Sequence, residues 1–310
     1  MKATIVSYSL IAEDVLEIRL SPVDGEMFPR YTAGAHLDVM LPGHGPRQYS
    51  LCGDGEEYVF CVQREHNGRG GSKYLHEHLK VGDLLEISEP RNSFPLVLDS
   101  PVLLIAGGIG VTPFFSMLQD LARQDRRFFL LYFVRSLTRV VYPALVETLV
   151  QKERCRLGIG LDPQVTAESI SEQIAALASG THVYVCGPAG LNHVVKETCA
   201  TRQDLYFHSE SFNPQNASSS AEPDRAFHVV LRKSGRRVLV DSSMSILEAL
   251  KRADIEVPSS CESGLCGTCR VNYTFGVVDH RDFVLSLEEK KCSLIACCSR
   301  AFSEEIELNL

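Results

Sequence analysis

Near its C-terminus the chain reads CESGLCGTC from Cys261 to Cys269, and Cys297 follows after a further 27 residues. This C-x4-C-x2-C…C spacing is the plant-type arrangement of thiolates around a [2Fe–2S] cluster. Each iron needs two thiolates, and the cluster sulfurs need backbone N–H donors, which Gly264 and Gly267 allow to come close. The stretch therefore predicts a plant-type ferredoxin domain that holds a [2Fe–2S] cluster.

The cysteine pattern also bears on the alternatives. The chain has eleven cysteines and no secretion signal, so clustered thiols indicate metal ligands rather than disulfides. Structural zinc also takes four cysteines, but it usually uses two C-x2-C pairs. The fourth ligand stays open on spacing alone, because Cys292, Cys297 and Cys298 are all candidates. Neighbours in an extended segment point to opposite sides, so only one of Cys297 and Cys298 can face the cluster.

Length and composition set the outer limits. With 310 residues the chain predicts two or three domains, and its 45% hydrophobic and 23% charged residues are ordinary for a soluble globular protein. No stretch approaches the roughly 18 apolar residues of a membrane span, and the N-terminus carries no signal peptide. A net charge of −8 argues against nucleic acid as a partner. We expect a cytoplasmic monomer without membrane contact.

From the C-terminus toward the N-terminus, the pattern of expected strands and helices changes three times and so divides the chain into four segments. Residues 226–310 form the expected cluster domain, with a hairpin turning at Ser234–Gly235 and a helix N-capped by Ser242 or Ser243. Residues 213–225 lack hydrophobic periodicity and predict a linker. Residues 99–212 alternate strands and helices, which predicts an α/β domain with a parallel sheet. Residues 1–98 read as short strands with one helix, which predicts an antiparallel β-barrel or sandwich.

Two motifs in the first domain point to a flavin. In the strand that contains RQYSL, Arg47 could pair with a phosphate, Tyr49 could stack on a flat ring, and Ser50 could bond polar ring atoms. Alone this pentapeptide is weak, and an ordinary strand with a polar edge is the better interpretation. The later run GRGGS precedes a helix, and its Gly70, Gly71 and Ser72 form a turn suited to a phosphate. Found in this order, the two motifs favour a bound flavin phosphate.

The second domain carries two turns suited to a nicotinamide cofactor. AGGIGVTP, residues 106–113, follows a buried strand and opens a helix, so its glycines let a pyrophosphate approach. The strand-end turn Cys186-Gly187-Pro188 belongs to the same predicted sheet, and both turns would open onto one crevice. Cys186 could lie beside the nicotinamide, although on spacing alone a buried structural thiol is the better interpretation. The candidate cofactor contacts in this half are Gly107, Gly108, Gly110, Arg135, Ser136, Cys186, Gly187 and Pro188.

Together these motifs resemble the phthalate dioxygenase reductase family of flavoproteins, especially its vanillate O-demethylase and carnitine monooxygenase reductase branches. The resemblance also covers SEPRNSFPL, VCGPAGL, DHRD at 279–282 and CCSRA at 297–301, so it spans nearly the whole chain. It implies a β-barrel flavin domain, a parallel-sheet NAD domain and a β-grasp (α+β) ferredoxin domain, in that order. It also implies FMN, NADH and a Rieske-type oxygenase that accepts the electrons.

The resemblance assigns roles to single residues. It implies flavin contacts from Arg47, Tyr49 and Ser50 with help from Gln63 and Arg64, and an FMN phosphate site at Gly70, Gly71 and Ser72. It places Thr112 by the reactive edge of the flavin and Phe212 over the ring. It selects Cys297 as the fourth iron ligand beside Cys261, Cys266 and Cys269, although valine is usual where this chain has Cys298.

The chemistry follows from the cofactors. Nicotinamide gives two electrons as hydride, an oxygenase takes them singly, and a flavin handles both steps, so the protein mainly sets distance and orientation. Thr112, Cys186 and Glu210 are the candidate catalytic residues at the flavin edge. Arg135 could meet a 2′-phosphate, which would favour NADPH, or contact the pyrophosphate or adenine. Two alternatives are an FAD-containing reductase of a diiron monooxygenase and a non-catalytic ferredoxin-type carrier.

Overall fold

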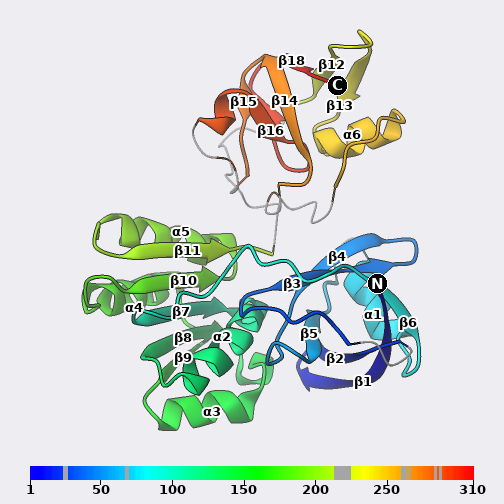
Figure 1. Cartoon of the computed structure of the whole chain (residues 1–310). Coiled ribbons are helices and arrows are strands. Elements are labelled where there is room, and N and C mark those ends of the chain that lie inside the picture. The colour runs from blue at the N-terminus through cyan, green and yellow to red at the C-terminus, as the bar shows by residue number, and fades with distance from the viewer. Residues whose placement is uncertain are drawn as a thin grey trace. The chain divides into compact units, whose positions relative to one another are not determined.

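The structure is a computed structural model that describes residues 1–23, 27–66, 70–212, 225–259, 264, 267–282, 285 and 288–310. The chain divides into two compact units, Met1–Phe212 and Asn213–Leu310, and each is described by itself (Figure 1). Most of the predicted linker, residues 213–224, lies outside the described residues. Among the described residues, no helix is long and apolar enough to cross a membrane.

The first part of unit 1 is an antiparallel sheet of short strands. Its strands run in the order β4-β3-β6-β1-β2-β5. A bridge between Leu51 and Phe60 joins the two edge strands and closes the sheet into a barrel. One helix, α1, interrupts the strands where SKYLHEH predicted it. The elements are β1 (Lys2–Ala12), β2 (Val15–Pro22), β3 (His36–Leu41), β4 (Gly45–Ser50), β5 (Tyr58–Gln63), α1 (Gly71–His78) and β6 (Leu84–Ile87).

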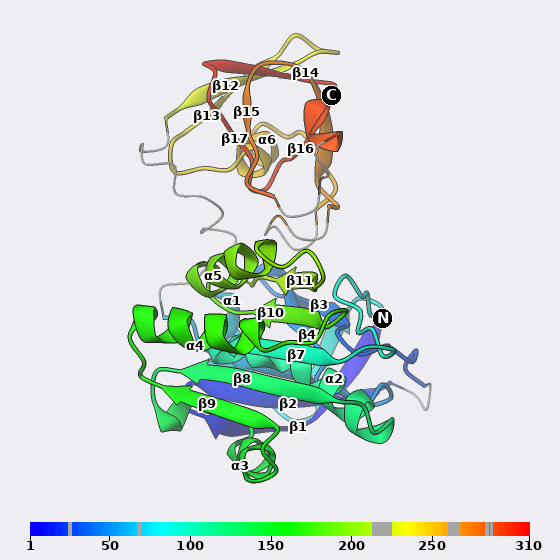
Figure 2. The same cartoon turned by 90° about the vertical axis from the view of Figure 1, so that its left-hand side faces the viewer.

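The second part of unit 1 is a parallel five-stranded sheet in the order β11-β10-β7-β8-β9. Continuous apolar runs such as VLLIAG form its central strands because both faces are covered by helices (Figure 2). The strands are β7 (Val102–Gly107), β8 (Phe128–Val134), β9 (Cys155–Ile159), β10 (His182–Cys186) and β11 (Tyr206–Glu210). The helices are α2 (Thr112–Arg123), α3 (Pro143–Gln151), α4 (Pro163–Ala175) and α5 (Ala189–Ala200), with 3-10 turns η1 (Gly108–Val111) and η2 (Leu137–Arg139).

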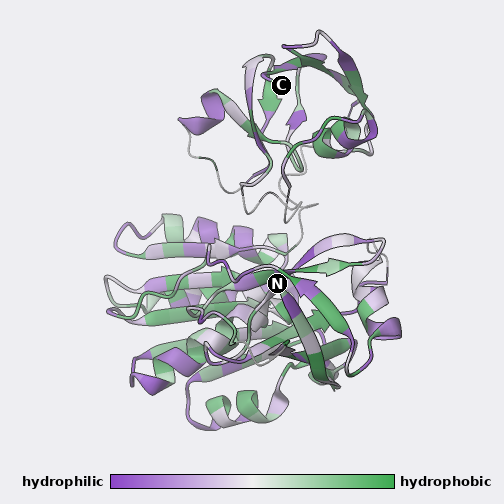
Figure 3. Ribbon diagram, turned by 45° about the vertical axis from the view of Figure 1, so that its right-hand side comes forward, coloured by the Kyte–Doolittle hydropathy of each residue, from purple (hydrophilic) through white to green (hydrophobic). Residues whose placement is uncertain are grey.

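Each face of this parallel sheet has its own core. Leu103, Ile105 and Val185 pack with residues of α4 and α5 on one face. Leu104, Tyr132 and Tyr184 pack with α2 and α3 on the other, and this second core includes Cys52 and Cys61 of the barrel part. Figure 3 shows green, hydrophobic residues along the strands and both colours alternating along the helices. The shared core explains why the barrel and the parallel sheet form one compact unit.

Unit 2 is a mixed sheet with one packed helix. Its strand order is β13-β12-β18-β14-β16, in which β12 and β18 are parallel and the other pairs antiparallel. The helix α6 (Ile246–Arg252) packs its buried face into the core of this sheet. The remaining elements are β12 (Phe227–Leu231), β13 (Arg237–Val240), β14 (Arg270–Phe275), β15 (Val278–Asp279), η4 (Glu289–Lys291), β16 (Ser293–Ile295), β17 (Arg300–Ala301) and β18 (Glu305–Leu308).

The predicted start of α6 was wrong by two to three residues. Ser245 is the N-cap and forms a capping box with Glu248, whose side chain returns to the Ser245 backbone N–H. The predicted caps Ser242 and Ser243 instead donate their hydroxyls to the Asp241 carboxylate in the preceding turn. The other features agree: the fold class is confirmed, and the hairpin between β12 and β13 turns at Ser234–Gly235, where Gly235 has φ +67°. The residue limits of the three domains stay predictions.

Candidate functional site

The N-terminus of α1 has the backbone and side-chain features that suit a phosphate. Gly70 adopts the left-handed conformation (φ +89°), and no side chain caps the helix. A Cβ built on Gly71 would lie 2.9 Å from Arg47 Nε, and one on Gly70 would lie 2.7 Å from His44 Cε1. Two side chains of the β3–β4 hairpin therefore lie directly over the glycines. Exposed helical N–H groups beside an arginine suit a dianionic phosphate.

The other residues predicted around the flavin have varied surroundings. Tyr49 is half-buried and stacks on Phe60, with ring centroids 5.1 Å apart. Ser72 Oγ accepts a hydrogen bond of 3.0 Å from the Glu65 backbone, so it holds the loop that leads into α1. Arg64 pairs with Glu77 of α1, and Gln63 ends β5. Gly68 and Arg69 lie outside the described residues.

The two glycine turns of the parallel sheet contact each other. A Cβ on Gly110 would lie 2.3 Å from the carbonyl oxygen of Cys186, and one on Gly107 would lie 2.7 Å from Pro188 Cδ. Only glycine permits this approach. Thr112 begins α2 and is buried, and its Oγ1 donates a 3.0 Å hydrogen bond to the Ile109 carbonyl. The turns thus flank one edge of the sheet, at the carboxyl ends of β7 and β10.

Cys186 and Glu210 are neighbours at this same edge. They are register partners on the parallel strands β10 and β11, and both side chains are buried. Burial, with the Glu210 charge adding to it, raises the pKa of the Cys186 thiol, so this thiol stays protonated. Burial also raises the pKa of Glu210 to about 8. This edge of the sheet therefore holds a buried thiol and a buried carboxyl that are both uncharged near neutral pH.

Three predicted residues lie at the rim. Phe212 follows β11, is 38% exposed, and is the last described residue of unit 1. Arg135 follows β8 and is exposed. Ser136 shares a 2.8 Å hydrogen bond with Thr138 in the turn η2. Their exposure fits contacts with a ligand that approaches from solvent.

Unit 1 holds a group of buried polar side chains, of which sequence reasoning named Ser50 and Glu210 but missed His36, Gln48 and Asn192. Among the described residues, His36 Nδ1 and Nε2, Gln48 Nε2, Ser50 Oγ, Asn192 Oδ1 and Glu210 Oε2 are buried side-chain atoms without a hydrogen-bond partner. Most buried polar atoms in folded proteins are paired, so such a group marks a place where polar ligand atoms fit. A flavin ring, with polar atoms along one edge, suits these donors and acceptors. For the missed residues, the sequence signals were a histidine at the start of the apolar strand β3 and a glutamine inside the RQYSL motif of β4.

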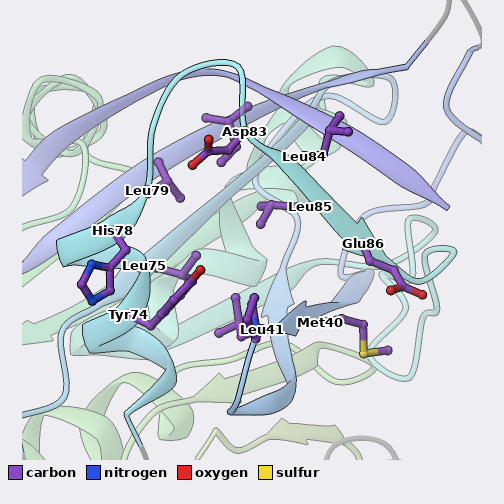
Figure 4. Close-up of a pocket in the computed structure, with 12 residues that line it drawn as sticks. Met40, Leu41, Tyr74, Leu75, His78, Leu79, Asp83, Leu84, Leu85 and Glu86 are labelled. Carbon is purple, nitrogen blue, oxygen red and sulfur yellow. The ribbon is translucent and has the colours of Figure 1, made fainter.

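A separate pocket of about 540 Å³ lies on α1 (Figure 4). Tyr74, Leu75 and His78 of α1 and Leu79, which follows the helix, line it opposite Leu85 of β6 and Leu41 of β3. Its lining contains none of the residues predicted to contact a cofactor. The geometry therefore does not connect this pocket with the cofactor site.

At the cluster loop, Cys261 and Cys266 lie outside the described residues, whereas Cys269 and Cys297 are described and buried. The Gly264 N–H donates to Cys297 Sγ at 3.2 Å, as a cluster-binding loop requires. The Cys297 thiol also hydrogen-bonds with Cys269 and Cys298. Cys292 is exposed and turns toward the Glu289 carbonyl. Two thiols in contact, with a backbone N–H beside them, fit one iron of a [2Fe–2S] cluster.

The comparisons with known proteins agree with this geometry. The family described as 2Fe-2S iron-sulfur cluster binding domain matches residues 229–302, and the oxidoreductase NAD-binding domain family matches residues 104–197. The chain is 37% identical to a vanillate O-demethylase oxidoreductase of Pseudomonas sp. (strain HR199 / DSM 7063), over 100% of both chains. It is 36% identical to the phthalate dioxygenase reductase of Burkholderia cepacia, over 100% of this chain and 97% of that protein.

This chain belongs to the phthalate dioxygenase reductase family. A solved phthalate dioxygenase reductase, described as a modular structure for electron transfer from pyridine nucleotides to [2Fe–2S], matches with a TM-score of 0.79 and 35% identity over 100% of this chain and 98% of that one. An intact type IV self-sufficient cytochrome P450 monooxygenase matches over 100% of this chain but 41% of its own length, with a TM-score of 0.73 and 32% identity.

Membership in the phthalate dioxygenase reductase family confirms the predicted fold, the NAD and [2Fe–2S] domains and the enzyme class. The protein is an oxygenase reductase that takes electrons from NADH and passes them through a flavin to a [2Fe–2S] cluster. This outcome sets aside the non-catalytic carrier. The roles of individual residues, including Cys297 as the fourth ligand, stay predictions.

Proposed function

We propose that this reductase binds FMN, prefers NADH to NADPH, and supplies electrons to a Rieske-type oxygenase. The observation that carries the FMN assignment is the uncapped N-terminus of α1, with Arg47 and His44 against its glycines. A terminal phosphate, with two negative charges, matches this cationic end. The oxygenase partner is supported by relatives such as the phthalate 4,5-dioxygenase oxygenase reductase subunit of Pseudomonas putida, which is 36% identical over 99% of this chain.

The bound flavin would supply the change from two-electron to one-electron transfer. The residues of this chain would bind and orient the cofactors around it. We propose flavin contacts from Arg47, Tyr49, Ser50, Gln63, Arg64, Gly70, Gly71, Ser72, Thr112 and Phe212. We propose nicotinamide-cofactor contacts from Gly107, Gly108, Gly110, Arg135, Ser136, Cys186, Gly187 and Pro188, and cluster ligands from Cys261, Cys266, Cys269 and Cys297.

Within this site Thr112, Cys186 and Glu210 would act on the reacting edge. The Thr112 hydroxyl is held by the Ile109 carbonyl, and Cys186 stays a neutral thiol because of burial. Neither has the partner of an activated nucleophile, so we assign them orientation and the exclusion of water. Glu210 is the only one of the three with a carboxyl group, and because burial raises its pKa to about 8, this carboxyl is protonated near pH 7.

The test begins with the flavin itself. Acid release from the purified protein followed by chromatography should give FMN, and FAD would overturn the assignment and favour the diiron-type reductase. The visible spectrum should show flavin and iron–sulfur absorption that NADH bleaches. Titration with NADPH should require a concentration at least about tenfold higher. Reconstitution with candidate oxygenases, scored by product formed per NADH consumed, identifies the partner.

A further inference from the structure

His36 is a buried histidine with no hydrogen-bond partner for either ring nitrogen among the described residues. It begins β3, and its register partner on β4 is Ser50, whose Oγ is also buried without a partner. His36 Nδ1 lies 4.0 Å from Glu210 Oε1 at the end of β11. An imidazole, a hydroxyl and a carboxyl from two parts of the unit thus converge where the flavin edge is proposed to lie.

The distance between His36 and Glu210 is that of an ion pair, but burial keeps both groups uncharged at pH 7. Burial lowers the pKa of His36 to about 4, the positive charge of Arg91 adds to this, and Asp38 opposes it. Burial alone raises the pKa of Glu210 to about 8. The pair is therefore a neutral base beside a neutral acid, which is the arrangement that lets a proton pass without a charge remaining behind.

The other titratable or polar groups that face the pair are few. Cys186, the strand neighbour of Glu210, is a protonated thiol. Arg91 pairs with Asp38 at 2.6 Å, and the Arg91 side chain is half-exposed. Asn192 of α5 donates to the Glu210 backbone carbonyl at 3.0 Å, which holds the end of β11 in place. The backbones of His36 and Arg91 exchange two hydrogen bonds, so a half-exposed arginine lies beside His36.

The reaction leaves a proton to be removed. A hydride carries two electrons and one proton, and the electrons leave singly toward the cluster, so one proton must leave the buried flavin edge in every cycle. We propose that His36 is the positioning partner of Glu210 and that the two residues carry this proton toward solvent. This inference rests on the proposed function.

In the step, a proton arrives at Glu210 Oε2 while the carboxyl proton passes from Oε1 to His36 Nδ1. His36 then gives up its Nε2 proton to a water molecule, and the ring is left in the tautomer with the proton on Nδ1. At the pair, one O–H bond and one N–H bond form as one O–H bond and one N–H bond break. The incoming proton breaks the bond to its donor, the outgoing proton forms an O–H bond with water, and no electron moves. A shift of about 1 Å brings Nδ1 and Oε1 from 4.0 Å into hydrogen-bond range.

Infrared spectroscopy tests the pair directly. The oxidised, flavin-loaded protein at pH 7 should show the C=O stretch of a protonated carboxyl, which Glu210→Gln removes and His36→Gln shifts. His208→Gln is the matched control, because burial also lowers the pKa of His208 to about 4 but that ring is hydrogen-bonded to His182 at 2.9 Å. A band that does not respond to His36→Gln contradicts the pairing.

Kinetics test the function of the pair. Stopped-flow experiments first measure hydride transfer from NADH in both proteins, which gives a reference rate for the His36→Gln protein. The His36→Gln protein should reduce a one-electron acceptor through the cluster about tenfold more slowly than wild type, with a larger solvent deuterium isotope effect, because proton transfer by a positioned side chain is worth at least that much. Equal rates and isotope effects in both proteins overturn the inference.

Failure of the proposed function and failure of the proton-carrier inference give different results. If NADH does not bleach the wild-type flavin, the proposed function is wrong, whereas normal bleaching with an unaltered His36→Gln protein refutes only the proton carrier. If His36→Gln does not hold flavin, ¹⁵N NMR of histidine-labelled protein replaces it. The neutral His36 ring should change its tautomer balance in Glu210→Gln, and an unchanged ring signal contradicts the proposal.

Discussion

At the scale of single residues, two adjacent thiols at the cluster loop differ in their surroundings. Cys297 accepts the Gly264 N–H and contacts Cys269. Cys298 turns its thiol toward the Ile295 carbonyl at 3.7 Å, and a Cβ on Gly264 would lie 2.7 Å from its sulfur. Cys297 thus has the contacts of a ligand, and Cys298 those of a small buried side chain packed on the loop.

We therefore expect Cys298→Val to keep the cluster and Cys297→Ala to lose most of it. Iron and sulfide content and the electron paramagnetic resonance spectrum of the reduced protein measure this, with a several-fold fall in bound iron for Cys297→Ala. Cys292→Ser, at an exposed thiol, is the control and should match wild type. If Cys298→Val alone lost the cluster, the fourth ligand would be Cys298.

Glu210 also predicts how stability depends on pH. Its pKa rises from 4.5 in the unfolded chain to about 8 in the fold, so between these values the folded state holds one more proton. Stability due to this group therefore falls as pH rises through that window. His36, whose pKa falls from 6.5 to about 4, acts in the opposite sense between pH 4 and pH 6.5, so the two effects largely offset there.

The net loss of folding stability should therefore appear above pH 6.5. Glu210→Gln lacks the titration, and its free energy of unfolding relative to wild type should improve by about 1–2 kcal/mol between pH 6.5 and pH 8. Urea unfolding of both proteins at the two pH values gives this difference. A constant difference would mean that Glu210 titrates normally in the fold.

At the scale of elements, the nicotinamide half depends on two turns that touch. The backbone at Gly110 approaches the Cys186 carbonyl so closely that a Cβ would lie 2.3 Å from it, whereas nothing lies within 4 Å of a Cβ on Gly190 in α5. The same substitution at these two positions thus has opposite steric consequences. The contact fixes the spacing between the ends of β7 and β10.

Gly110→Ala should destabilise unit 1 by about 1–3 kcal/mol through overpacking and raise KM for NADH several-fold. Gly190→Ala, with open space and a helical position, should be neutral or slightly stabilising. Thermal unfolding and steady-state kinetics with ferricyanide as acceptor measure both effects. Equal unfolding temperatures and equal KM values for the two variants would show that the two turns can move apart without loss of stability or NADH binding.

At the scale of the whole molecule, the flavin and NAD parts share one compact unit and the cluster belongs to the other. The two-electron half of the reaction should therefore survive loss of the cluster. We expect Cys266→Ser to keep NADH-dependent reduction of ferricyanide within about twofold and to lose, by at least about a hundredfold, transfer to a protein acceptor. If ferricyanide reduction also vanished in folded, flavin-loaded protein, the electron order would be wrong.

Much of this arrangement is readable from local sequence. The strand and helix periods predicted the antiparallel and parallel sheets of unit 1, because apolar alternation and glycine turns act within a few residues. The choice of a barrel over a sandwich and the β-grasp fold came from the family resemblance. The start of α6 was misplaced because Ser242, Ser243 and Ser245 look alike in sequence, and only the Glu248 side chain selects Ser245. His44 and His36 were missed because nothing in their local sequence distinguishes a ligand contact from a core histidine.

The sequence by itself determined the thiolate spacing of a [2Fe–2S] site and the order of the three cofactor motifs, because thiolate spacing and glycine-rich turns are short motifs whose geometry is local. Only the tertiary structure decided which distant residues meet. His36 reaches Glu210 because the barrel strand β3 and the parallel strand β11 end at the same place. Likewise Cys297, rather than Cys298, receives the Gly264 N–H. Such pairings depend on sheet register and on packing between parts of the unit, which are long-range properties of the folded chain.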